Sequence, residues 1–174
     1  MTTQPRAMTR AVPGRDTSEV SKVYQEGILA GIIGAATIAL WYLILDGING
    51  RPLYTPTVLG TALFHGGKII SPESLPVSFG MVLNYTWVHG VTFCVIGGIA
   101  SHLLALAEKN PNLGFGILLL FVVLDYGFVV GTMLFAQPIL HAFAWPAVLV
   151  GNLLAAAAMA GYFWRRHPNL TIRP

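Results

Sequence analysis

The stretch that decides the fold is residues 28–48, which read ILAGIIGAATIALWYLILDGI. It holds only one charged residue, Asp46, close to its end. An α-helix rises about 1.5 Å per residue, so this stretch reaches about 31 Å, which matches the hydrocarbon core of a bilayer. We therefore predict that it forms a transmembrane helix.

Further apolar stretches of similar length follow along the chain. They cover residues 79–106, 113–136 and 145–164. The last of them is bounded by Trp145 and Trp164, which places an indole ring at each membrane interface. The sequence thus predicts an all-α integral membrane protein with four transmembrane helices.

The composition leads to the same conclusion. The chain has 174 residues, 55% of them hydrophobic and 10% charged, with a mean hydropathy of +0.66. A soluble domain carries about 25% charged residues. Of the 17 charged residues, seven lie in residues 1–26 and three in residues 165–174, which leaves seven for residues 27–164. This distribution excludes a soluble enzyme, a nucleic-acid-binding domain and, with Cys94 as the sole cysteine, a disulfide scaffold.

The two polar tails predict the orientation. Eight of the ten basic residues fall on the side that both tails share when the number of spans is even, and only Arg51 and Lys68 fall on the other side. The positive-inside rule then places both termini in the cytoplasm, with the chain in a bacterial inner membrane. We expect residues 1–26 to be a flexible tail, in which Asp16 or Thr17 caps a short interfacial helix through Gln25. A basic lipid-binding arm or a transit peptide is the less favoured interpretation.

The first outer loop, residues 49–78, contains one predicted element. Thr55 is a candidate N-cap, with Pro56 at the first helical position, and residues 57–64 follow with apolar residues at helical spacing. We expect a short amphipathic helix that lies in the outer interface.

Ionisable groups within a span are the best functional clues in a membrane protein. Asp125 lies at the predicted midplane of the third span, with His89 and Asn152 at comparable depths in spans two and four. These three residues could meet as a proton relay, a quinone or small-ligand site, or a contact to a haem or pigment. The favoured interpretation is a structural clasp that fixes helix order.

A second polar pair is predicted near the outer surface. Asp46 and His141 lie at similar depths, and a bond from Asp46 to either His141 or Arg51 would be structural. No histidine lies at the depth of His89, and no metal-binding motif is present, so we expect no metal site. We likewise expect no cofactor of its own, only contact with lipid, quinone, haem or pigment held by a partner subunit.

Small residues indicate helix packing. Gly127 and Gly131 lie on the face of span three opposite Asp125, which suggests that protein covers both faces of this span. Further packing glycines are Gly31, Gly34 and Gly151. We expect membrane lipids and other integral subunits, or a second copy of the chain, as partners, and no nucleic acid.

These features favour a non-catalytic accessory subunit of a multisubunit, energy-transducing membrane complex, respiratory or photosynthetic. The alternative is a small oligomeric transporter or channel that uses Asp125, His89 and Asn152. An enzyme is less favoured, because no nucleophile is paired with a base.

Overall fold

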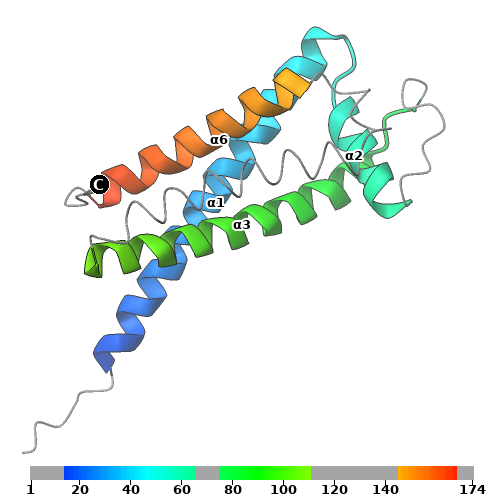
Figure 1. Cartoon of the computed structure of the whole chain (residues 1–174). Helices are drawn as coiled ribbons and strands as arrows, with labels where there is room; N and C mark the ends of the chain where they lie inside the picture. Colours follow the sequence, from blue (N-terminus) through cyan, green and yellow to red (C-terminus); the bar gives the residue numbers. More distant parts are fainter. Residues whose placement is uncertain (1–13, 66–74, 111–144, 168–174) are drawn as a thin grey trace, which may run out of the picture.

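The computed structural model describes residues 14–65, 75–110 and 145–167, and within these ranges it is helical, with no strand. The helices are α1 (Gly14–Ile48), α2 (Tyr54–Phe64), α3 (Phe79–Lys109) and α6 (Trp145–Arg166) (Figure 1). Three of them, α1, α3 and α6, are long and apolar enough to cross a membrane, so the described residues confirm the helical fold and three of the four predicted span-length helices. The predicted third span, residues 113–136, lies outside the described residues.

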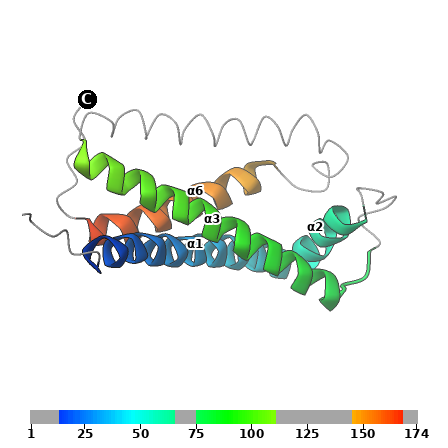
Figure 2. The ribbon, with the colours of Figure 1, turned by 90° about the horizontal axis from the view of Figure 1, so that it is seen from below.

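Helix α1 organises the other helices. Both α3 and α6 pack against it, and α2 packs on α3 near one end (Figures 1 and 2). Residues 23–26 of α1 and the last residues of α3 and α6 meet at one end, which we call the basic end because it carries Lys22, Lys109 and Arg166, and the first turns of α1 extend beyond it (Figure 1). The opposite end, where α1 leads into α2, is called the loop end.

The first helix is longer than the predicted span. It begins at Gly14, whereas the sequence predicts a separate interfacial helix ending at Gln25 and a span starting at residue 28. The two predicted elements are one continuous helix that runs through Gly27. This glycine lies directly against Gly98 of α3, and such a close approach favours a residue without a side chain. Helices α3 and α6 begin where the spans are predicted to begin and end two or three residues later.

Glycines allow the backbones of α1 and α3 to touch. A Cβ atom at Gly31 would collide with the backbone of Phe93 and Cys94, and one at Gly97 would collide with the backbone of Gly27 and Gly31. We call this contact the glycine crossing. Transmembrane helices gain little from burying apolar surface against each other, so close approach at small residues is a main source of their association.

A second contact holds α6 against α1. The indole of Trp41 covers Gly151 and donates a hydrogen bond from Nε1 to the carbonyl of Ala147, at 2.9 Å. Towards the basic end, Gly34 lies against the side chain of Met159. Met159 belongs to a small core with Ala30, Ala100 and Phe163.

The start of α2 differs from the prediction. Thr55 does not cap the helix, because the helix begins one residue earlier, at Tyr54, and its N-cap position is Leu53 with φ of 64°. Thr55 and Thr57 are buried, and Gly60 lies against the backbone of Met81. Helix α2 is therefore packed onto α3 through a face that includes threonines as well as apolar residues.

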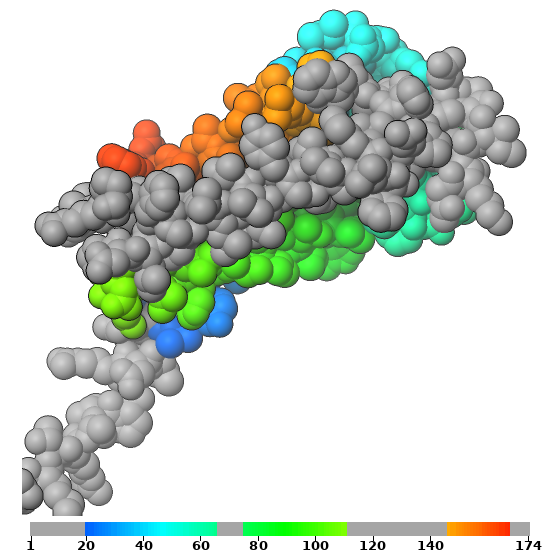
Figure 3. All heavy atoms as spheres, in the orientation of Figure 1, coloured from blue at the N-terminus to red at the C-terminus, as the bar shows by residue number. Residues whose placement is uncertain are grey.

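Most of the apolar surface points outwards. In each of the three candidate spans, only 22% of the most apolar window is buried within the protein. One side of α3 is visible along its length in Figure 3, and Leu83, Trp87 and Val95 are all more than half exposed on this helix. An outward apolar surface of this length is the arrangement that a bilayer or partner helices would cover.

Candidate functional site

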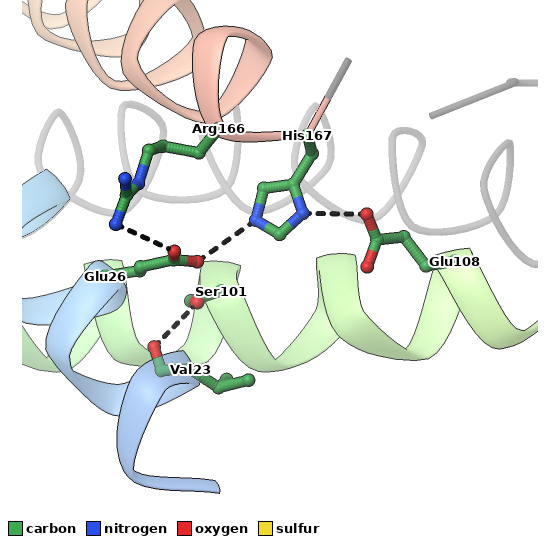
Figure 4. A network of polar contacts seen from close by, with 6 residues as sticks. All are labelled: Val23, Glu26, Ser101, Glu108, Arg166 and His167. Carbon is green, nitrogen blue, oxygen red and sulfur yellow. Dashed lines mark hydrogen bonds and ion pairs between the residues drawn. The ribbon is translucent and has the colours of Figure 1, made fainter. Parts of the chain in front are cut away.

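A network of charged side chains joins three helices at the basic end (Figure 4). His167, directly after α6, lies between two carboxylates. Its Nδ1 is 2.7 Å from Oε1 of Glu108 on α3, and its Nε2 is 3.2 Å from Oε2 of Glu26 on α1. Arg166 contacts the other oxygen of Glu26, with Nη2 at 3.2 Å from Oε1. We call these four residues the basic-end cluster.

Helix ends position the cluster. The backbone N–H of His167 donates to the carbonyl of Phe163 at 2.8 Å, which continues the hydrogen-bonding pattern of α6 by one residue. Nearby, the hydroxyl of Ser101 on α3 donates to the carbonyl of Val23 on α1 at 2.8 Å (Figure 4). The second contact fixes α3 against α1 about two turns from Glu108, so the carboxylates of both helices reach the imidazole of His167.

A different polar site lies at the loop end. The carboxylate of Asp46, at the end of α1, accepts two hydrogen bonds from Thr55, one from its backbone N–H and one from its hydroxyl, each at 2.7 Å. Asp46 is only 5% exposed. A carboxylate beside the first N–H groups of a helix satisfies donors that have no partner within the helix, and it interacts favourably with the helix dipole.

The predicted partners of Asp46 are arranged differently. Arg51 approaches Asp46 through its backbone, with its N–H donating to the Asp46 carbonyl at 2.8 Å. Its guanidinium lies 4.0 Å from the centre of the Tyr54 ring, in a cation–π contact. His141, the other predicted partner, lies outside the described residues.

The predicted midplane cluster is described only in part. His89 is on α3 and faces α1, where its Nε2 is 3.4 Å from the carbonyl of Ala35. Its ring stacks on Tyr85 at 5.6 Å and packs against Phe93 at 4.8 Å. Asn152 is half-buried on α6, and no contact between it and His89 is seen in the described part of the chain.

The remaining predicted site residues fall elsewhere. Asp125, Gly127 and Gly131 lie outside the described residues. Gly31 and Gly34 lie at the contacts of α1 with its neighbours, and Gly151 lies beneath Trp41. Within residues 14–65, 75–110 and 145–167, no group of three or more histidine, cysteine or acidic side chains is placed to hold a metal ion.

Sequence reasoning assigned no role to the basic-end cluster. The available signal was positional, because Glu26 lies two residues before the first predicted span, Glu108 two residues after the second, and His167 three residues after the fourth. Antiparallel packing brings these three positions to the same end. Distance along the sequence concealed the contact, since Glu26 and His167 are 141 positions apart.

Comparison with protein-family models, with curated proteins and with solved structures finds no match to this chain. The function must therefore be argued from the residues and their arrangement.

Proposed function

We propose that the chain is a non-catalytic accessory subunit of a multisubunit bacterial membrane complex, with an energy-transducing complex, respiratory or photosynthetic, as the favoured setting. The observation that carries the proposal is that polar side chains between the helices contact each other, while many apolar side chains on the outer faces of the helices are exposed. Polar groups between the helices contact one another, whereas fewer than a quarter of the residues in the most apolar window of each candidate span are buried.

Several contacts support the first half of this argument. Asp46 is used to hold the start of α2, and His89 lies against a backbone carbonyl of α1. Glu26 and Glu108 are used to hold the end of α6. Side chains engaged in this way fix the order and register of helices, which is the main requirement for a subunit that supports its neighbours.

The outward faces support the second half. Trp87 is 73% exposed and lies eight residues into α3, so its indole is displaced from the helix end, where membrane-anchoring tryptophans are usual. Together with Val88, Val91 and Thr92 it lines a shallow hollow. Tryptophan is enriched among residues that dominate the binding energy of protein interfaces. We propose that a helix of a partner subunit packs on this face of α3.

Purification of the tagged full chain from its native membrane in mild detergent tests the proposal. We expect larger subunits to co-purify, identified by mass spectrometry, with an absorption spectrum that reveals any haem or pigment they carry. Trp87→Ala should lower the yield of these subunits, whereas Trp164→Ala, which removes a similarly exposed indole at the basic end, should not. A single monodisperse species without partners would contradict the proposal.

A small oligomeric transporter or channel is the second candidate, in which Asp125, His89 and Asn152 would line the path. One observation favours it. Towards the loop end, Nε2 of His89 on α3 lies 3.4 Å from the carbonyl of Ala35 on α1, and the ring of Tyr85 stacks on that of His89. Histidine side chains within a membrane span are typical of proton paths.

Flux measurements in liposomes distinguish the two candidates. A transporter or channel predicts that His89→Gln abolishes proton or solute flux, whereas His102→Gln, an exposed histidine on the same helix, leaves the flux unchanged. The accessory-subunit proposal predicts no flux through the unmodified chain or through either variant. A measurable flux through the isolated unmodified chain would favour the second candidate.

A further inference from the structure

The basic-end cluster places each ring nitrogen of His167 against a carboxylate oxygen. The two distances are 2.7 Å, to Glu108, and 3.2 Å, to Glu26. An ionised carboxylate only accepts hydrogen bonds, and a neutral imidazole has only one N–H to donate. A neutral ring between two ionised carboxylates can therefore make only one of these hydrogen bonds. Both can form only when the three side chains hold one additional proton.

We propose that Glu26, Glu108 and His167 form a proton-binding site at the basic end. The bound proton gives an imidazolium that donates to both carboxylates, and it thereby holds the end of α6 to α1 and α3. When the proton leaves, one of the two hydrogen bonds is lost, and the bare ring nitrogen faces a carboxylate oxygen.

Charge and burial within the cluster support the proposal. Arg166 neutralises one carboxylate, so the four side chains are neutral together only when His167 is protonated. The side chains of His167 and Glu26 are 15% and 18% exposed, so solvent and salt screen their interaction only in part. Charge-assisted hydrogen bonds of this kind are roughly twice as strong as neutral ones.

Among the side chains that the structure describes, the other charged residues and histidines near this end come from all three helices, and two tyrosines, Tyr24 on α1 and Tyr162 on α6, also lie there. The charged residues and histidines are Lys22 on α1, His102 and Lys109 on α3, and Arg165 on α6. All four are exposed, and none has a described contact with Glu26, Glu108 or His167. They place positive charge around the cluster but cannot replace the proton between the two carboxylates, because they lie outside hydrogen-bonding distance in the part of the chain described.

The sign of the pH effect follows from the donors. The arrangement with two hydrogen bonds needs the additional proton, so we expect it to be favoured at acidic pH and to weaken as the pH rises. Thermal unfolding of the full chain in lipid nanodiscs, between about pH 5.5 and about pH 8.5, covers the range in which histidine side chains titrate. We expect the Tm to fall by about 5 °C over this range.

Matched variants separate His167 from the other histidines. His167→Gln should have a lower Tm at acidic pH and little further fall as the pH rises. His167→Arg, which keeps a planar cation, should keep a higher Tm at both pH values. His102→Gln removes an exposed histidine of α3 and should titrate like the unmodified chain. A fall in Tm that survives in His167→Gln, or no fall in the unmodified chain, would overturn the proposal.

Two further measurements keep the test decisive if His167→Gln fails to fold. In Glu108→Gln, the amide can donate to a neutral ring, so the fall in Tm with pH should shrink. Nitrogen NMR of histidine-labelled protein, with Glu108→Gln identifying the His167 signal by its change, should show both ring nitrogens protonated at acidic pH. A neutral tautomer of His167 at acidic pH, or an unaltered fall in Glu108→Gln, would contradict the proposal.

Discussion

The two ends of the bundle bind carboxylates in opposite ways. At the loop end, Asp46 is 5% exposed and accepts from neutral donors of Thr55, nine positions further along the chain. At the basic end, Glu26 contacts cationic or titratable groups on another helix, 141 positions away in the case of His167. The Asp46–Thr55 contact is local in sequence and orders the turn between α1 and α2. The contacts of Glu26 join residues far apart in the sequence, hold α6 to α1, and depend on charge.

The glycine crossing, which starts one residue after Glu26, sets how closely α1 and α3 pack, so breaking it should have the largest effect. Gly97→Ala adds a methyl group against the backbone of Gly27 and Gly31, which cannot rotate away. We expect the free energy of unfolding to fall by about 2–3 kcal/mol. Reversible unfolding in detergent measures the loss, and reduced hydrogen-exchange protection at both ends would show that the crossing affects both.

The neighbouring glycine provides a matched control. A Cβ atom at Gly98 meets open space, so Gly98→Ala should leave stability unchanged or raise it by up to about 1 kcal/mol through better helix propensity. Equal losses for the two variants would show that helix propensity, and not the crossing, determines stability here.

The second largest effect is expected at the loop end. Asp46→Ala leaves the buried N–H and hydroxyl of Thr55 without their acceptor, and we expect a loss of about 2–3 kcal/mol in the free energy of unfolding. Thr55→Ser keeps the hydroxyl and should lose less than Thr55→Val, which removes it. Unfolding curves for the three variants provide the test, and similar values for Thr55→Ser and Thr55→Val would mean that the hydroxyl contributes nothing.

Features that depend on residues close in the sequence could be predicted, whereas contacts between distant helix ends could not. The described long helices follow from uninterrupted apolar runs, because a run of about 20 residues is a strong and local signal. The start of α1 was less predictable, because residues 14–26 are polar and lack the apolar run that marks a span, although they belong to the same helix. A polar role for Asp46 could be inferred from its place at the end of a span.

The partners of these groups were harder to predict. Thr55 was expected to cap α2 itself, but Leu53 adopts a left-handed conformation and the helix starts at Tyr54, which turns Thr55 towards Asp46. His167 could have been noticed as a titratable group beside a span, but its partners lie on other helices. A pattern within one helix carries no information about which helix end lies opposite, so the basic-end cluster needed the structure.

A smaller loss of stability is expected when the hydrogen bond from Trp41 of α1 to α6 is removed. Trp41→Phe removes the hydrogen bond to the Ala147 carbonyl but keeps an aromatic ring over Gly151. We expect a loss of about 1 kcal/mol, typical of hydrogen bonds between membrane helices. Trp164→Phe alters an exposed indole and serves as the control. Equal unfolding free energies for Trp41→Phe and Trp164→Phe would show that the hydrogen bond from Trp41 does not stabilise the position of α6.

The smallest effect is the salt dependence, and it distinguishes the two ends most directly. Arg166 is 54% exposed, so its ion pair with Glu26 should contribute less than about 1 kcal/mol at low salt. Near 1 M salt, where the Debye length is about 3 Å, the difference in Tm between the unmodified chain and Arg166→Gln should nearly vanish. The difference for Thr55→Val should persist, because the donors to Asp46 are neutral and buried. If salt reduced both differences equally, the two ends would not differ in kind, and the contrast drawn from their exposure and partners would be wrong.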